Sequence, residues 1–257
     1  MIPLNFFSSM EKLPKDQTDV RQLLTGKESA AVGRRMFMRY LGATAAAGVA
    51  LSACQNEIAE PVVRGAGRAG EAIDLGDLGS NDAGVLNYAY ALEQLEAAFY
   101  IQVIATPYSG MTQMEREILM DIRDHEIVHR ELFKAALSTA AIPGLTPNFS
   151  SINFGNRASV LGTAKVFESI GVSAYNGAGR LLTNPDFLVL AGKIVSVEAR
   201  HASIISELLN PGTTSFAGDD VIFPNSGLEE TRNPEEVLAI VKPYIQEIIN
   251  GKYLRNA

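Results

Sequence analysis

The sequence has no Trp and a single Cys, Cys54, among 257 residues. One Cys excludes an intramolecular disulfide and a Cys-rich zinc site. Basic residues are also few, because 22 Lys+Arg stand against 29 Asp+Glu and give a formal charge of −7. We therefore expect no nucleic-acid partner, since such a partner requires clustered positive charge. The chain is 47% hydrophobic and 20% charged, which is the composition of a globular protein that can build a core.

A hydrophobic run long enough to span a membrane is missing from the N-terminal region. Residues 40–53 are apolar and uncharged, but they number 14, where a spanning helix needs roughly 20. The run follows a basic stretch, residues 33–39, and ends in small residues before Cys54. This order is the layout of an export signal. The alternative is a cytoplasmic protein with an apolar N-terminal helix, but the single Cys stands at the end of the run.

Both ends of this segment resemble known signals. Arg34-Arg35, followed by Phe37, resembles the twin-arginine signal, and Leu51-Ser52-Ala53-Cys54 resembles a lipoprotein cleavage box. The resemblance implies a bacterial protein that is exported in its folded state, cut before Cys54 and lipidated on that sulfur. Residues 1–53 are then the export signal. The lipid would anchor the protein to a membrane of the periplasm or cell envelope.

The rest of the chain changes character twice. Residues 54–80 are rich in Gly, Ala and charge, and we expect a flexible tether there. The tether contains the spacing Gly65-x-Gly67-x-x-Gly70, but no strand–turn–helix context surrounds it, so no nucleotide site is predicted. Helical periodicity then dominates and predicts helices over about 82–105, 112–139, 157–182 and 185–209. A C-terminal extension, 211–257, follows, with a fifth helix from Asn233-Pro234 to about Ile249.

The lengths of the connections predict how the helices pack. The first two helices and the last two are joined by short connections, so each pair is antiparallel. The segment 140–156 is long enough to cross the length of a bundle. Two hairpins joined by one long crossover predict an all-α, ferritin-like four-helix bundle over 81–210, with the extra C-terminal helix packed outside.

Acidic side chains interrupt the inward faces of all four helices near their middle. Burying carboxylates costs several kcal/mol each unless protonation, ion pairs or metal offset it, and no Lys or Arg lies on these faces. Residues three apart on a helix project side by side, so each Glu-x-x-His presents a carboxylate and an imidazole to one point. The six converging residues are Glu93, Glu126, His129, Glu168, Glu198 and His201. Such an oxygen-rich, thiol-free set suits two iron ions or, alternatively, two manganese ions; a metal-free core of mutually paired groups is the other alternative.

The pattern repeats between the two hairpins. Glu93 is followed seven residues later by Tyr100, and Glu168 is followed seven residues later by Tyr175. Each hairpin therefore has Glu-x6-Tyr and then Glu-x2-His, as a pseudo-two-fold bundle requires. The ligand set also matches that of the di-iron carboxylate bundles, in which two helices each give a Glu and two give a Glu-x-x-His.

Residues 85–100, VLNYAYALEQLEAAFY, resemble the first helix of the ferritin-like family that includes the plant desiccation-related proteins. The similarity extends over about 81–250. It implies the six ligands named above, with Glu93 rather than Glu96 as the ligand of the first helix, because the Glu seven before a Tyr is the ligand in that group. It also implies that Tyr100 and Tyr175 donate hydrogen bonds to ligating carboxylates.

Two further residues near the cluster have less defined roles. Glu96 has no partner acid on the third helix, where Gly171 stands, and is an additional or alternative ligand, a proton carrier or a salt-bridge partner. His125 lies one step off the inward face, and we expect it to be solvated or to support a ligand.

The family resemblance leaves three functions open, since one fold hosts many activities. We expect a redox enzyme whose di-iron centre reduces oxygen or peroxide with electrons from Fe(II) or another donor. The alternatives are a dimanganese, catalase-like centre that disproportionates hydrogen peroxide, and a non-enzymatic stress protein of the cell envelope. The expected partners are a small-molecule oxidant or metal ion and a membrane; pairing into a homodimer stays open.

Overall fold

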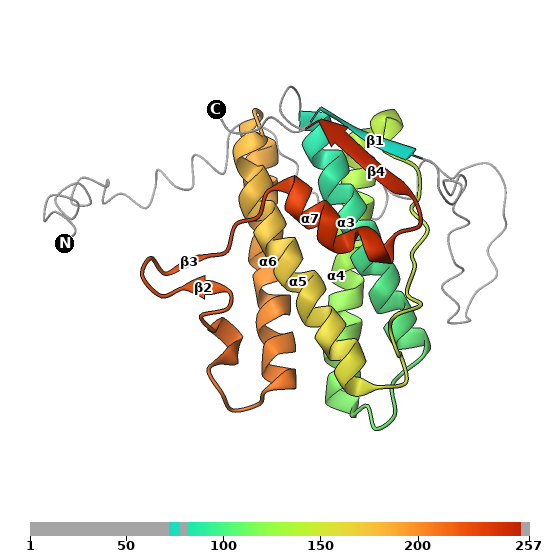
Figure 1. Ribbon diagram of the computed structural model, residues 1–257, viewed down its shortest axis with the longest axis vertical. Helices are drawn as coiled ribbons and strands as arrows, with labels where there is room; N and C mark the ends of the chain where they lie inside the picture. Colours follow the sequence, from blue (N-terminus) through green and yellow to red (C-terminus); the bar gives the residue numbers. More distant parts are fainter. Residues whose placement is uncertain (1–71, 78–81, 253–257) are drawn as a thin grey trace, which may run out of the picture. The chain divides into compact units, whose positions relative to one another are not determined.

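The computed structural model describes residues 72–77 and 82–252 (Figure 1). The predicted export signal, Cys54 and most of the predicted tether lie outside these residues. Within the described ranges no helix combines the length and the apolar character that a bilayer crossing requires.

Four long helices form the bundle, and the all-α, ferritin-like prediction is confirmed (Figure 1). The helix α3 pairs with α4, and α5 pairs with α6, as the short connections predict. Their bounds are α3 Asp82–Ala105, α4 Gln113–Leu137, α5 Arg157–Ala178 and α6 Pro185–Leu209. The third helix was expected to reach residue 182; its last turn, Gly179–Leu181, is instead a 3-10 turn.

The helices begin where side chains can bind their free N–H groups. At the start of α4 the Thr112 hydroxyl accepts from the Glu115 N–H at 3.1 Å, and the Glu115 carboxylate accepts from the Thr112 N–H at 2.9 Å. This reciprocal capping box satisfies two N–H groups that the helix itself cannot bind. At the start of α6 the Asn184 side chain accepts from the Asp186 N–H at 2.9 Å, and Pro185 stands in the first turn.

The crossover between α4 and α5 lies along the outer side of α3. The Asn87 side chain donates to the Ala140 carbonyl at 3.0 Å and accepts from the Ile142 N–H at 2.9 Å. Two turns further along, the Gln94 side chain accepts from the Leu145 N–H at 2.9 Å. These amides tie the long connection to the helix, so α3 is buried on almost every side: 17 of its 24 residues are buried.

The C-terminal extension differs from its prediction. The fifth helix, α7, covers only Pro234–Val241 and continues as a 3-10 turn, Lys242–Tyr244, so it ends before the expected Ile249. Pro243 lacks an N–H and opposes a regular helix at this point. The chain then extends into β4, Ile248–Lys252, which pairs in parallel with β1, Ala72–Asp77.

The strand β1 corrects the predicted extent of the tether. Residues 72–77 were expected to be flexible, but β1 contacts α3 and alternates buried Ile73 and Leu75 with exposed neighbours. Burial of these apolar side chains, together with the pairing to β4, fixes the segment. A second short hairpin joins β2, Ile222–Phe223, to β3, Leu228–Glu229.

One glycine of α5 marks a close approach by the C-terminal extension. A Cβ added at Gly177 would lie 1.8 Å from the carbonyl oxygen of Arg232. The guanidinium of Arg232 donates to the Ser173 hydroxyl at 2.8 Å, and its backbone N–H donates to the Ser173 carbonyl at 3.1 Å. Only a residue without a Cβ allows this backbone to reach the helix.

Gly177→Ala should therefore destabilise the protein by about 1–3 kcal/mol, because the extension must move away from α5. The measurement is chemical denaturation followed by circular dichroism. Gly162→Ala is the matched control in the same helix: its Cβ would meet nothing within 4 Å, and it should be neutral or stabilising by up to about 1 kcal/mol. Equal stabilities of the two variants would contradict this account of the contact.

Candidate metal centre

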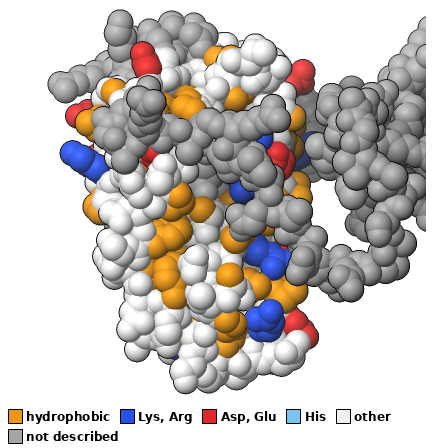
Figure 2. All heavy atoms as spheres, turned by 90° about the vertical axis from the view of Figure 1, so that its right-hand side faces the viewer, with side chains coloured by type: hydrophobic (Ala, Val, Ile, Leu, Met, Phe, Trp, Pro, Cys, Tyr) orange, Lys and Arg blue, Asp and Glu red, His pale blue; other side chains and the backbone are white. Residues whose placement is uncertain are grey.

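The structure brings the six predicted side chains together in the interior of the bundle. Glu93 comes from α3, Glu126 and His129 from α4, Glu168 from α5, and Glu198 and His201 from α6. The four carboxylate residues are 0% exposed, and the two histidines are 8% and 4% exposed. Figure 2 shows one face of the molecule, where hydrophobic side chains of the described residues lie among scattered Lys or Arg and Asp or Glu side chains.

The six residues form two groups that could each hold a metal ion. The first group is Glu93, Glu126, His129 and Glu198, and the second is Glu126, Glu168, Glu198 and His201; in each, the ligand atoms lie within 4.8 Å of one another. Glu126 and Glu198 belong to both groups. Two carboxylates common to both groups are what a bridged pair of ions requires.

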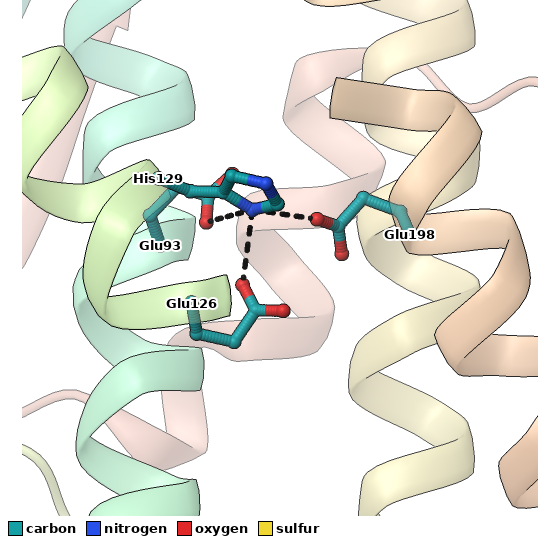
Figure 3. A group of neighbouring side chains, drawn as sticks. All are labelled: Glu93, Glu126, His129 and Glu198. Atoms are coloured by element: carbon teal, nitrogen blue, oxygen red, sulfur yellow. Dashed lines mark ion pairs between the residues drawn. The ribbon is translucent and has the colours of Figure 1, made fainter. Parts of the chain in front are cut away.

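Each histidine turns its Nδ1 toward the carboxylates of its group. The Nδ1 of His129 lies 3.0 Å from Glu198, 3.4 Å from Glu93 and 3.5 Å from Glu126 (Figure 3). In the second group, the Nδ1 of His201 lies 2.8 Å from Glu126, 3.3 Å from Glu168 and 3.9 Å from Glu198. The two Glu-x-x-His motifs are thus used alike, one in each hairpin.

In the described part of the chain, the carboxylates that belong to one group accept a hydrogen bond from a tyrosine, whereas the two that belong to both groups do not. Tyr100 of α3 donates to Oε1 of Glu168, and Tyr175 of α5 donates to Oε1 of Glu93, so each tyrosine binds an acid of the other hairpin. Glu93 and Glu168 therefore keep one free oxygen each. Neither oxygen of Glu126 or of Glu198 accepts a hydrogen bond from another described residue, and their contacts are the ion-pair distances to the two histidines, as expected of ligands common to both groups.

The buried atoms that lack a hydrogen-bond partner are the same atoms that would ligate. Among the described residues they include Oε2 of Glu93 and Glu168, both carboxylate oxygens of Glu126 and Glu198, and Nδ1 of both histidines. A buried polar atom without a partner costs about 1–3 kcal/mol, and more when it is charged. Eight such atoms facing one another fit two cations of the kind that carboxylates and imidazoles bind.

The carboxylates cannot all be ionised without a cation. Burial raises the pKa of Glu198 well above its ordinary value, and the charges of Glu126 and Glu93 raise it further. Burial likewise raises the pKa of Glu93 to about 7, against the opposing effect of His129. Burial would also raise the pKa of Glu126, but its contacts with both histidines lower it to about 2.

The histidines show the opposite response. Burial would lower the pKa of His129, but the carboxylates of Glu126, Glu198 and Glu93 raise it to about 12. The same balance raises the pKa of His201 to about 10. Two imidazolium ions balance only two of the four carboxylates, so without metal the remaining acids must hold protons, as the raised pKa values of Glu168 and Glu198 indicate.

Glu96 lies beside the centre but outside both groups. It is 3% exposed, and burial followed by the charge of Glu198 raises its pKa well above the ordinary value. A Cβ added at Gly171 would lie 3.1 Å from Oε1 of Glu96 and 3.4 Å from Oε2 of Glu198. The missing side chain at Gly171 therefore leaves space for the Glu96 carboxyl beside Glu198.

His125 contacts the centre from outside. Its Nδ1 lies 2.9 Å from Nε2 of His201, and the two rings meet edge to edge, with centroids 5.2 Å apart and planes 8° from parallel. Its position one residue before Glu126 gave no indication of this partner, because the contact joins two helices.

The fold and these eight atoms define a four-helix bundle of the carboxylate–histidine type, with a buried site that could bind metal. The family profile of the ferritin-like domain matches residues 81–211, and the chain belongs to this family. Compared with the sequences of curated proteins, the chain has no significant match.

Replacing either tyrosine by Phe should weaken metal binding by about 10–100-fold without unfolding the bundle, because the hydroxyl holds a ligating carboxylate in place. Tyr100→Phe should affect the ion nearest Glu168, and Tyr175→Phe the ion nearest Glu93. Metal affinity and far-UV circular dichroism would be measured together. A variant with full affinity would show that the hydroxyl does not position the ligand.

Proposed function

We propose that this chain is an exported, lipid-anchored ferritin-like protein whose di-iron centre carries out redox chemistry on oxygen, peroxide or Fe(II). The observation that carries the proposal is the set of eight unpartnered buried atoms, arranged as two groups with two carboxylates in common. When bound, a pair of iron ions can supply or accept electrons in such a reaction.

The chain's own residues would bind the ions and restrict access to them. Glu126 and Glu198, which belong to both groups, would help to hold both ions, while Glu93, Glu168 and the two histidines would each help to hold one. Tyr100 and Tyr175 would keep the terminal carboxylates in place through their hydrogen bonds. Because the ligands are at most 8% exposed, the substrate would be a small molecule.

The same ligand set also suits a second metal. Carboxylates and imidazoles bind manganese as well as iron, so a dimanganese centre that disproportionates hydrogen peroxide is the alternative reaction. A non-enzymatic, desiccation-related role in the cell envelope is the alternative outside catalysis, in which the metal would only stabilise the bundle.

The first experiment is elemental analysis of the protein purified from its own cell envelope. We expect about two ions per chain, and a protein that is metal-free and takes up none on supplementation would end the proposal. Iron- and manganese-loaded samples would then be compared for Fe(II) oxidation and for oxygen evolution from peroxide. Fe(II) oxidation supports the di-iron reaction, oxygen evolution with manganese supports the alternative, and neither activity favours the structural role.

Export and lipid anchoring are supported by the N-terminal sequence. Cys54→Ala should move the protein from the membrane fraction to the soluble fraction. Replacing both Arg34 and Arg35 by Lys should keep it in the cytoplasm, with its metal content unchanged. Unaltered fractionation of Cys54→Ala would contradict the lipid anchor without touching the metal centre.

A further inference from the structure

The contact between His125 and His201 makes the surroundings of the two proposed metal positions unequal. His201 points Nδ1 at the carboxylates of Glu126 and Glu168, so Nε2 is its outward nitrogen. That nitrogen lies 2.9 Å from Nδ1 of His125, whose side chain is exposed.

Ligation would fix the direction of this hydrogen bond. A neutral imidazole that gives its Nδ1 lone pair to a metal carries its proton on Nε2. Nε2–H of His201 would then donate to Nδ1 of His125, and the proton of His125 would lie on its own Nε2. Because the ring planes are only 8° from parallel and the two nitrogens are 2.9 Å apart, this hydrogen bond lies close to the planes of both rings.

Among the described residues, the proposed metal position that contains His129 has no histidine hydrogen-bonded to its ligating imidazole. The residue that corresponds to His125 in the second hairpin is Val197, one residue before Glu198, and its side chain cannot accept a hydrogen bond. In the part of the chain that the structure describes, the ion pairs of His129 all involve Nδ1, and no hydrogen bond joins its Nε2 to another group.

We propose that His125 is a positioning residue for His201, and that the ion held with His201 and Glu168 is therefore bound more tightly than the ion held with His129 and Glu93. The inference rests on the dimetal centre proposed above. A hydrogen bond to the outer nitrogen fixes the orientation of a ligating histidine and makes the ligating nitrogen more basic, and its loss weakens metal binding by about 10–100-fold.

The test uses Mn(II) as the probe on the full chain, with variants that leave one metal position at a time. Glu93→Gln keeps the group that contains His201, and Glu168→Gln keeps the group that contains His129. His125→Leu should lower Mn(II) affinity by about 10–100-fold in the Glu93→Gln protein and leave it unchanged in the Glu168→Gln protein. Calorimetry gives the affinities, and the electron paramagnetic resonance of the single bound Mn(II) reports its ligand environment.

Two further variants act as controls. His125→Asn offers an amide oxygen as the acceptor and should restore most of the affinity and the spectrum in the Glu93→Gln protein. Asp124→Asn changes an exposed neighbour that pairs with Arg123 and should have no effect.

Unchanged affinity of the His125→Leu protein in the Glu93→Gln background would overturn the inference, as would an equal loss in both backgrounds. Either result would leave the metal centre itself standing. A wild-type chain that binds no Mn(II) or iron would instead overturn the proposed centre, and this inference with it.

Discussion

Glu126→Ala should lose both metal ions, whereas Glu96→Gln should keep them. Glu126 belongs to both groups of ligands and has two unpartnered buried oxygens. Its removal would take one ligand from each of the two groups. Glu96 belongs to neither group, so its conversion to an amide leaves every ligand in place.

The measurement is metal content after loading with Fe(II) or Mn(II) and dialysis, together with thermal unfolding. In the wild type, metal at 100 times its dissociation constant should add about 2.7 kcal/mol of stability for each ion. Glu126→Ala should show no such gain. Glu126→Gln keeps the volume of the side chain and serves if the Ala variant folds poorly.

Retention of metal by the Glu126 variant, or its loss from the Glu96 variant, would contradict the ligand assignment. If Glu96→Gln empties the site, then Glu96 is the ligand of α3 and the choice of Glu93 is wrong. If Glu126→Gln retains two ions, Glu126 does not bridge them.

The local chemistry of the chain made the helices and the acids predictable. The capping box at Thr112 and the Asn184-Pro185 start depend on residues close in sequence, and the predicted helix starts agree with them. The acids were found because a carboxylate on an apolar inward face is costly. The choice of Glu93 over Glu96 came from the resemblance to the ferritin-like family, in which the Glu seven before a Tyr is the ligand, and the structure places Glu93 within one of the two groups.

Contacts between distant segments were not predictable in this way. The pairing of β1 with β4 joins Ala72 to Ile248, and neither short strand has enough alternation to be recognised alone. The covering of α3 by the crossover depends on Asn87 and Gln94, which look like surface amides in a helical sequence. The partner of His125 is 76 residues away, so only the folded bundle shows which nitrogen it binds.

The stability of the metal-free protein should fall between pH 5 and 8, while that of the metal-loaded protein should not. The pKa of Glu93 is raised to about 7, so its contribution is fully present below the unfolded pKa of about 4.5 and is lost as the pH rises through 7. The pKa values of His129 and His201 are raised to about 12 and about 10. Their contributions are present below pH about 6.5 and decline above it.

Each extra proton that the folded state holds lowers its stability by at most about 1.4 kcal/mol per pH unit as the pH rises. Glu126 behaves in the opposite sense, because its pKa is lowered to about 2 and its contribution is lost only below pH about 4.5. Metal-free stability should therefore be greatest near pH 4.5 and decline towards pH 8.

Bound metal should counteract this fall in stability with rising pH, because metal and protons compete for the same carboxylates and imidazoles. Ligating carboxylates and imidazoles must be deprotonated, so metal binding releases protons and strengthens as the pH rises. The difference in unfolding free energy between Mn(II)-loaded and chelator-treated protein should widen from pH 5 to pH 8 in denaturation experiments. Glu126→Gln should show no difference at any pH. An equal difference at pH 5 and pH 8 in the wild type would mean that the ions bind at groups other than the buried carboxylates and histidines.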